Sequence, residues 1–379
     1  MRRALLAVAV LAASVLSALA PSAGAADPAQ PRLDAAAWYL VGPDGAVLAQ
    51  RASRRERAVA SITKVMTALV VLEHARPGDV VRVSPRAAGL GGSTVYLRAG
   101  EELTVAALIR ALLVPSANDA AQALALHVGR GSTDRFVALM NEKARELGLT
   151  DTTFVNAHGL DARGHVSSAR DATLLVRHAL GIPLLRDALS RSSVTLPGGR
   201  EFETTDDLLR SWPGLVGGKT GHTRDAGWSQ AAAASARGVT VYGAVLGSDT
   251  REARNDALRE LLVYGLRQYR RVEVVDRGRV YAEAVTGYGR PAVQLVAARR
   301  VVRTLRAGTG LVERVVAPRA VVLPVEEGRR LGRVDVYAEG RLLATSPLVA
   351  AETVSEPGLF GKARWYATRT LDNLWEMVT

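Results

Sequence analysis

Over the first 270 or so positions, the spacing of apolar residues predicts a hairpin, then a series of helices, then strands again. Apolar runs at 36–41 and 46–50 flank Gly42-Pro43-Asp44-Gly45, which predicts a β-hairpin. The nearly continuous apolar sequence at 61–74 predicts a helix buried on most sides. Further helices, bounded by capping, Gly or Pro signals, are predicted at 105–114, 120–128, 135–147, 169–180 and 255–269.

Apolar or alternating runs at 227–235 and 239–246, joined by Arg237-Gly238, predict antiparallel strands. Strands therefore lie at both ends of this region, with helices between them. We predict an α+β domain over residues 26–269, in which an antiparallel sheet assembled from distant segments is covered by helices.

Beyond position 270 the pattern changes to short Val-rich segments separated by Gly, Pro and Arg. This predicts a small all-β domain at 270–352, to which we assign a spacer or docking role and no catalysis. Its strands are expected at 272–275, 292–296, 320–323, 333–338 and 342–344.

The last segment, 353–379, is predicted to contain a linker and an amphipathic helix. Its apolar face comprises Phe360, Ala363, Ala367, Leu371, Leu374, Trp375 and Val378. Arg364 interrupts this face, and Trp365 lies away from it. Such a helix can lie in a membrane interface; the alternative is a helix packed on its own protein.

The N-terminus has the features of an export signal. Arg2 and Arg3 precede an apolar run at 4–19 and the small residues Ala23-Gly24-Ala25, which predicts a signal peptide over 1–25. An uncleaved anchor is the alternative. Either way, we expect an exported, periplasmic or extracytoplasmic protein, attached peripherally to the outer face of the cytoplasmic membrane through the C-terminal helix.

Composition narrows the chemistry. The absence of cysteine excludes disulfides, a thiol nucleophile and cysteine-based metal sites, and the 6 histidines form no HExxH pair, so we expect neither metal nor cofactor. The net charge of +12 favours anionic lipids or wall polymers, or simply reflects an arginine bias. Export makes nucleic acid the least favoured partner.

Lysine is rare in this basic chain. Among 49 basic residues, the lysines are Lys64, Lys143, Lys219 and Lys362. A desolvated lysine can lose its proton and act as a base, which an arginine cannot do. Lys64 follows Ser61 by one helical turn within apolar sequence, so it is a candidate base for a serine nucleophile.

Two further short motifs follow. Ser116-Ala117-Asn118 precedes a helix and could project a hydroxyl and a carboxamide into a cleft. Lys219-Thr220-Gly221 follows Gly217-Gly218 and could supply positive charge and a carboxylate-binding hydroxyl. A phosphate loop is disfavoured because the required G-x-x-x-x-G-K spacing is absent.

In this order, SxxK, SxN and KTG are far more specific than any one of them. The chain resembles the low-molecular-mass penicillin-binding proteins, the serine D-alanyl-D-alanine carboxypeptidases, over roughly residues 34–269. The matching segments are Ala60-Ser61-Ile62-Thr63-Lys64-Val65-Met66-Thr67-Ala68-Leu69, Ser116-Ala117-Asn118-Asp119-Ala120-Ala121, Leu139-Met140-Asn141, Asn156-Ala157-His158-Gly159-Leu160-Asp161 and Lys219-Thr220-Gly221-His222-Thr223.

The resemblance implies a β-lactamase/transpeptidase-like fold, peptidoglycan stem peptides as substrates and covalent binding of β-lactam antibiotics. Ser61 would be the nucleophile and Lys64 its base, with Ser116 relaying protons. The backbone N–H groups of Ser61 and His222 would form the oxyanion hole. Substrate binding would fall to Asn118, Lys219, Thr220, Gly221, His222 and an arginine, Arg254 by preference and Arg251 as the fallback.

The chain departs from the family at Val59, where proline is usual, at Gly217-Gly218, and at Asp206-Asp207, near which an asparagine is often found. Class A β-lactamases need a glutamate between the second and third motifs, and none occurs from 147 to 200. A D,D-endopeptidase shares all three motifs and stays open. A non-catalytic wall-binding protein is disfavoured by the intact serine and lysines.

Overall fold

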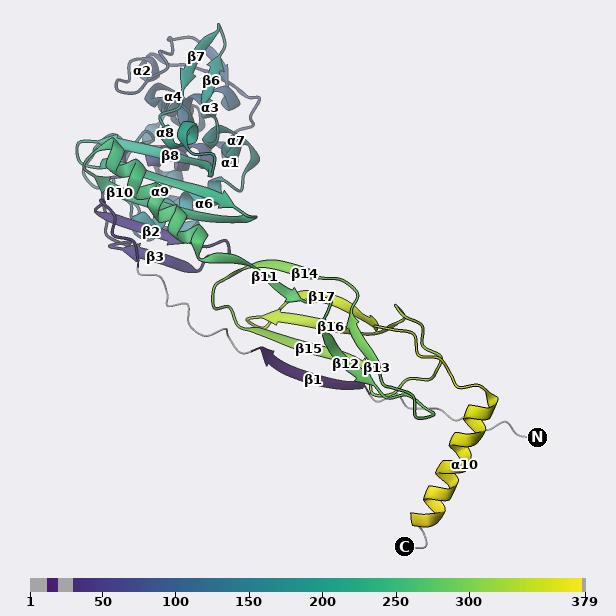
Figure 1. Cartoon of the computed structure of the whole chain (residues 1–379). Coiled ribbons are helices and arrows are strands. Elements are labelled where there is room, and N and C mark those ends of the chain that lie inside the picture. The colour runs from purple at the N-terminus through teal and green to yellow at the C-terminus, as the bar shows by residue number, and fades with distance from the viewer. Residues whose placement is uncertain (1–11, 20–29, 377–379) are drawn as a thin grey trace. The chain divides into compact units, whose positions relative to one another are not determined.

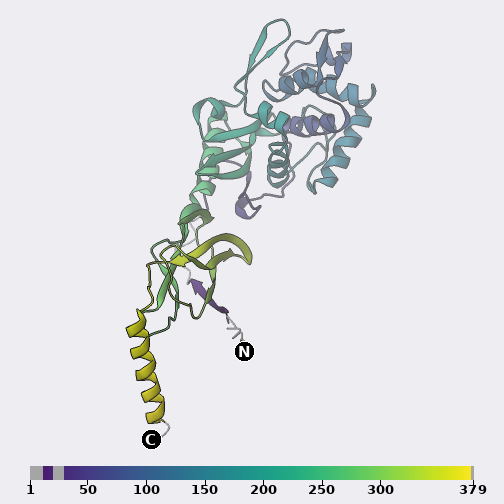
Figure 2. The ribbon, with the colours of Figure 1, turned by 90° about the vertical axis from the view of Figure 1, so that its right-hand side faces the viewer.

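The computed structural model describes residues 12–19 and 30–376, which fall into two compact units (Figures 1 and 2). One unit covers residues 30–268. The other contains residues from Tyr269 onward together with 12–19. The boundary inside the chain follows the helix that the sequence predicts at 255–269.

The first unit is built on a 5-stranded antiparallel sheet in the order β3-β2-β10-β9-β8. The predicted hairpin pairs with a strand far along the chain, with Leu40 opposite Gly243. The strands are β2 (Ala37–Val41), β3 (Val47–Arg51), β8 (Leu215–Thr223), β9 (Gly227–Ala236) and β10 (Val239–Ser248).

Helices cover both faces of this sheet. For this reason every residue in the middle of β9, from Gln230 to Ala234, is buried, whichever face its side chain is on. Figures 1 and 2 show α9 (Arg251–Arg267) on one face and the helices between residues 63 and 189 on the other. Gly265 of α9 fits closely over Leu40, because an added Cβ would come within 2.9 Å of that side chain.

The predicted helices are confirmed with small shifts at their ends. They are α1 (Thr63–His74), α3 (Val105–Leu113), α4 (Asn118–Val128), α5 (Thr133–Glu146) and α6 (Ala169–Ala179). The capping signal before α6 is real, since Ser168 Oγ accepts from Asp171 N at 3.1 Å. The prediction that α9 starts at 255 is wrong, because Thr250 caps the helix through Ala253 N and it begins at Arg251.

Several short elements were not predicted. They are α2 (Pro85–Ala88), α7 (Pro183–Leu189), α8 (Asp207–Ser211), the hairpin of β4 (Val80–Arg82) with β5 (Glu102–Thr104), and that of β6 (Ser193–Leu196) with β7 (Arg200–Glu203).

The second unit is β-rich, with a 6-stranded sheet in the order β1-β15-β16-β17-β13-β12 and a 2-stranded sheet of β11 and β14. Its core is mostly valine, with alanine and leucine. The strands are β1 (Ala12–Leu19), β11 (Tyr269–Val275), β12 (Val280–Ala284), β13 (Val293–Ala297), β14 (Val301–Arg306), β15 (Leu311–Pro318), β16 (Arg330–Ala338) and β17 (Arg341–Ala350).

Two expectations from the sequence are not met in this unit as they were stated. The strand predicted at 320–323 is wrong: Ala320 makes an isolated bridge to Val285, and Pro318 and Pro324, which lack an N–H donor, bound the segment. The predicted signal peptide lies largely outside the described residues, and its described part is β1, which pairs antiparallel with β15.

The C-terminal helix is α10 (Leu359–Glu376). Trp365, which lies off the predicted apolar face, packs edge-on against Tyr288 of the β-rich unit with ring centroids 5.4 Å apart. Lys362 lies 5.3 Å above the same tyrosine ring. Of the helices in the described ranges, none combines the length and apolarity needed to cross a membrane.

Candidate active site

Ser61 lies in a 3-10 turn, Ala60–Ile62, immediately before α1, rather than on the first turn of the α-helix as predicted. Ala60 has a left-handed backbone, φ 48°. Two glycines enclose this turn: a Cβ on Gly159 would overlap the carbonyl oxygen of Ala60, and one on Gly221 would lie 2.7 Å from the carbonyl oxygen of Val59. The backbone around Ser61 is therefore fixed from two sides.

Lys64 is fully buried, and its Nζ lies 2.6 Å from Ser61 Oγ and donates to the carbonyl oxygen of His158 at 2.7 Å. Burial, reinforced by the charge of Lys219, holds the pKa of Lys64 well below its usual value, while Asp119 opposes the shift. A neutral amine at this distance can accept the proton of the serine hydroxyl.

Lys219 is also buried, and its Nζ donates to the carbonyl oxygen of Thr220 at 3.1 Å. Burial lowers its pKa to about 7; Asp206 acts in the opposite direction, and Arg254 adds to the lowering. Burial therefore lowers the pKa of both lysines, and Lys64 is the one whose Nζ lies beside the serine hydroxyl.

The second motif follows α3. Ser116 is buried and has a left-handed backbone, φ 66°, a strained conformation for a residue other than glycine. Asn118 begins α4, and its Nδ2 donates to Gly91 O at 2.9 Å. Ser93, which the sequence did not single out, fixes this segment: its Oγ donates to Pro115 O at 2.8 Å, and its carbonyl accepts from Asn118 N at 2.7 Å.

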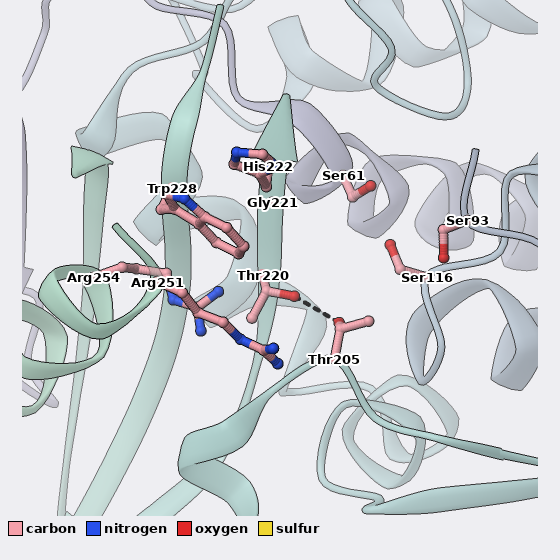
Figure 3. Close-up of a pocket in the computed structure, with 10 residues that line it drawn as sticks. All are labelled: Ser61, Ser93, Ser116, Thr205, Thr220, Gly221, His222, Trp228, Arg251 and Arg254. Atoms are coloured by element: carbon pink, nitrogen blue, oxygen red, sulfur yellow. Dashed lines mark hydrogen bonds between the residues drawn. The ribbon is translucent and has the colours of Figure 1, made fainter. Parts of the chain in front are cut away.

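These elements surround a cavity of about 250 Å³ (Figure 3). Six of the predicted site residues line it: Ser61, Ser116, Thr220, Gly221, His222 and Arg254. The remaining lining residues are Ser93, Thr205, Trp228 and Arg251. Lys64, Asn118 and Lys219 are buried and do not line the cavity.

An aromatic stack forms one wall. The rings of His222 and Trp228 are stacked 4.0 Å apart at 24°, because these residues are opposite each other in the ladder of β8 and β9. The guanidinium of Arg254 lies 5.7 Å from the Trp228 ring. Trp228 could not be identified from local sequence, because its place in the site depends on strand register.

The segment Thr204–Asp207 was also missed, although it joins three parts of the site. Thr205 N donates to Val114 O at 3.3 Å, and its Oγ1 lies 2.7 Å from Thr220 Oγ1. The buried Asp206 accepts from Gln230 Nε2 at 2.7 Å.

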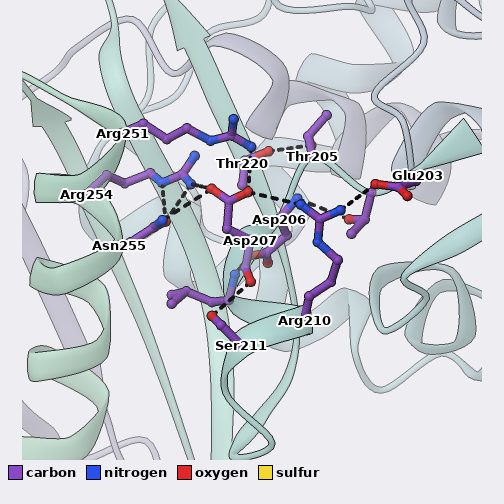
Figure 4. Close-up of polar contacts among 12 residues, drawn as sticks. Glu203, Thr205, Asp206, Asp207, Arg210, Ser211, Thr220, Arg251, Arg254 and Asn255 are labelled. Carbon is purple, nitrogen blue, oxygen red and sulfur yellow. Dashed lines mark hydrogen bonds and ion pairs between the residues drawn. The ribbon is translucent and has the colours of Figure 1, made fainter.

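Asp207 is the counter-ion of Arg251 and Arg254 on α9 (Figure 4). Its carboxylate accepts from Arg251 at 2.6 Å, from Asn255 Nδ2 at 3.2 Å and from Arg254 at 3.5 Å. The one sequence signal here was the pair of acids at a position where the family often has an asparagine.

The structure places His165 as a support for α1. Its Nδ1 accepts from Val155 N at 3.0 Å, so the proton of the neutral ring is on Nε2, which lies 2.7 Å from Thr63 Oγ1. Burial lowers the pKa of His165 to about 4, against the opposing charge of Asp161. The ring is therefore neutral at pH 7, as a structural histidine should be.

A serine in a closely packed turn beside a buried lysine of lowered pKa, together with a lysine-threonine-glycine strand, is typical of the penicillin-binding serine enzymes. The family model "D-alanyl-D-alanine carboxypeptidase" matches residues 24–250, and the chain belongs to that family.

The chain is similar in sequence and in structure to known proteins over most of its length. The D-alanyl-D-alanine carboxypeptidase DacC of Escherichia coli is 32% identical over 376 residues, covering 90% of each chain. Penicillin binding protein 5 of Haemophilus influenzae has a similar structure, with TM-score 0.63 and 27% identity, covering 86% of this chain and 99% of that one. A Streptomyces DD-transpeptidase has TM-score 0.59 and 29% identity, and covers 63% of this chain and 99% of its own.

Proposed function

We propose that this protein is a serine D-alanyl-D-alanine carboxypeptidase that removes the terminal D-alanine from peptidoglycan stem peptides. The observation that carries the proposal is the 2.6 Å approach of Lys64 Nζ to Ser61 Oγ, with the pKa of the lysine lowered by burial. Family membership supplies the substrate class.

The reaction follows from this pair. Ser61 Oγ attacks the carbonyl carbon of the D-Ala-D-Ala bond while its proton passes to the neutral Lys64. The backbone N–H groups of Ser61 and His222 would stabilise the oxyanion. Protonation of the leaving nitrogen, relayed through Ser116, releases D-alanine. Water then attacks the ester, regenerating the serine.

The roles of the other residues are part of the proposal. The Asn118 carboxamide and the Lys219 charge would align the peptide, and the Thr220 hydroxyl would bind the terminal carboxylate. Thr220 lines the cavity, which supports its assignment. Asn118 and Lys219 do not line the cavity, so they would act from beneath the residues that do. β-Lactams would acylate the same serine and leave slowly.

The location is proposed from the sequence. Residues 1–25 would be a removed signal peptide, 26–269 the catalytic domain, 270–352 the β domain, and 353–379 a linker and helix that attaches to the membrane surface. The high exposure of Leu359 and Phe360, 87% and 94%, supports an apolar end of α10 able to enter a lipid interface.

Mass spectrometry of purified muropeptides after incubation with the enzyme tests the activity. We expect pentapeptides to lose one D-alanine, and Ser61→Ala to abolish this loss. Splitting of cross-linked dimers without trimming of pentapeptides would instead identify an endopeptidase.

A further inference from the structure

One loop, at 91–97, joins the cavity to the second motif. Ser93 lines the cavity, and its carbonyl oxygen accepts from Asn118 N at 2.7 Å. The side chain of Asn118 donates to Gly91 O at 2.9 Å. The first half of the loop is therefore held by a residue of the motif itself.

The second half of the loop is held by Asp119. Its carboxylate is buried and accepts from Val95 N at 3.2 Å and from Leu97 N at 3.0 Å. Val95 and Leu97 are buried, whereas Tyr96 between them is 77% exposed. From the other side, Arg200 Nη1 donates to Tyr96 O at 3.3 Å. The loop thus fixes the backbone of Tyr96 and leaves its side chain largely exposed.

The backbone of Tyr96 is strained. Its φ of 55° is left-handed, which is an outlier for a bulky side chain. Such strain persists only where the surrounding contacts impose it, and it gathers at ligand sites. Ala60 and Ser116, which are also left-handed, both belong to the site motifs. A largely exposed ring adds little to the core, so packing of the ring does not account for the strain at Tyr96.

The loop lies at the end of the cavity away from the lysine-threonine-glycine strand. Figure 3 shows Ser61 between Thr220 on one side and Ser93 on the other. In the proposed reaction the terminal carboxylate is at Thr220 and the reacting carbonyl is at Ser61. The part of the stem peptide that precedes the D-Ala-D-Ala bond therefore extends towards Ser93 and the loop that carries Tyr96.

We propose that Tyr96 binds the substrate upstream of its D-Ala-D-Ala end, by packing its ring against C–H groups of the stem peptide or of the amino sugar attached to it. Tyr96 is then a specificity residue, which favours whole muropeptides over short peptides with the same reacting end. The inference rests on the proposed carboxypeptidase function and adds a contact outside the cavity.

The physical reason is the character of the side chain and the way it is held. A tyrosine ring offers a large apolar face at low conformational cost, while its hydroxyl can stay in water. The hydrogen bonds of Asp119 and Arg200 fix the backbone before the substrate arrives, so less ordering is required on binding.

The test compares three substrates with the same reacting end: an acylated tripeptide ending in D-Ala-D-Ala, the stem pentapeptide and the disaccharide pentapeptide. For Tyr96→Gly we expect kcat/KM on the longer substrates to fall about 3- to 10-fold, as for one lost aromatic contact, with less than about a twofold change on the tripeptide. A fall on both longer substrates places the ring against the peptide, and a fall on the disaccharide pentapeptide alone places it against the sugar.

Glycine is the sharpest variant, because it adopts a left-handed backbone without strain and so keeps the loop in place. Tyr96→Ala removes the same ring and should show the same falls. Tyr96→Phe keeps the ring and should stay within about twofold of the wild type on every substrate. Tyr366→Ala, which removes an exposed tyrosine of the β-rich unit, is the matched control and should change none of the three values.

Equal falls on all three substrates in Tyr96→Gly would mean that the side chain only supports the loop, and no fall on any would mean that it does not contact the substrate. Either result overturns the proposal. If the wild-type protein trims none of the three substrates, the proposed function itself fails, and this outcome is distinct from the others.

Discussion

At the scale of single residues, the proposed chemistry depends on which buried lysine accepts the proton of the serine hydroxyl. Two buried lysines belong to the site motifs, and burial lowers the pKa of both. Asp119 and Asp206 each counteract the shift at one lysine. Because Lys64 Nζ lies 2.6 Å from Ser61 Oγ, whereas Lys219 Nζ donates to the carbonyl oxygen of Thr220, we infer that Lys64 is the base and that Lys219 supplies positive charge.

Lys64→Arg keeps the positive charge but removes the base, because a guanidinium does not lose its proton in a protein. We expect acylation by fluorescent penicillin to slow about 10²- to 10⁴-fold, the usual contribution of a general base. Stopped-flow fluorescence gives the rate. Near-normal acylation would remove the base role from Lys64.

The motif residues could be found from the sequence because each motif is local. Ser61 and Lys64 are one turn apart, and Lys219, Thr220 and Gly221 are consecutive. Thr205, Asp207 and Trp228 could not be found, because they reach the cavity through strand register and long-range contacts. For the arginines, the sequence offered Arg254 by preference and Arg251 as the fallback, and both line the cavity.

At the scale of elements, close packing of the loop at 156–161 and of β8 fixes the turn that carries the nucleophile. The departure from the family at Gly217-Gly218 has a reason at this scale: a Cβ on Gly218 would overlap the Ala232 side chain on the neighbouring strand β9. The strand that carries Lys219 can thus pair closely with β9.

Gly159→Ala tests the packing of this loop. Gly159 and Gly164 both have left-handed backbones, φ 86° and 80°, but a Cβ on Gly164 meets nothing within 4 Å. Both alanine variants should incur similar backbone strain. We expect only Gly159→Ala to displace the Ser61 turn and slow acylation, by about 100-fold. Equal acylation rates in the two variants would contradict this role.

Secondary structure was predictable where the pattern was long and regular, as in α1 or the hairpin of β2 and β3. In the β-rich unit, β12, β14 and β15 were missed because arginine and glutamate interrupt their apolar positions. The segment at 320–323 was predicted as a strand because its sequence is apolar, but the flanking prolines keep it out of the ladder.

At the scale of the whole molecule, the chain combines a catalytic unit with a β-rich unit that carries α10. Trp365 illustrates what periodicity alone does not show. It departs from the apolar stripe because its partner is Tyr288, whereas Phe360, Ala363 and Ala367 of the stripe are exposed. Packing on its own protein therefore involves the side of the helix that carries Trp365, and lipid binding by the apolar stripe stays a prediction.

Deletion of residues 361–379 tests the membrane role. We expect the full-length mature protein to sediment with phosphatidylglycerol vesicles and the truncated protein to stay in the supernatant, with unchanged kcat/KM on a soluble tripeptide. Continued sedimentation of the truncated protein would show that α10 is not the attachment.

Stability should depend on pH through His165. Because its pKa in the folded state, about 4, is below the unfolded value near 6.5, its stabilising contribution is complete above pH 6.5. It is lost as pH falls towards 4. Between pH 7 and 4, urea unfolding should show the wild type losing roughly 2–3 kcal/mol more than His165→Gln. Equal losses in the two proteins would exclude this contribution.

The most direct test of the central claim is a titration of the lysines by NMR, using protein labelled with 13C at lysine Cε. The chain has so few lysines that Lys64, Lys143, Lys219 and Lys362 can be assigned individually. We predict that Lys64 is a neutral amine at pH 7, while Lys143 and Lys362, whose pKa values are raised by Glu73 and Glu356, remain charged. A Lys64 that stays cationic to pH 10, in an enzyme fully active at pH 7, would contradict the mechanism.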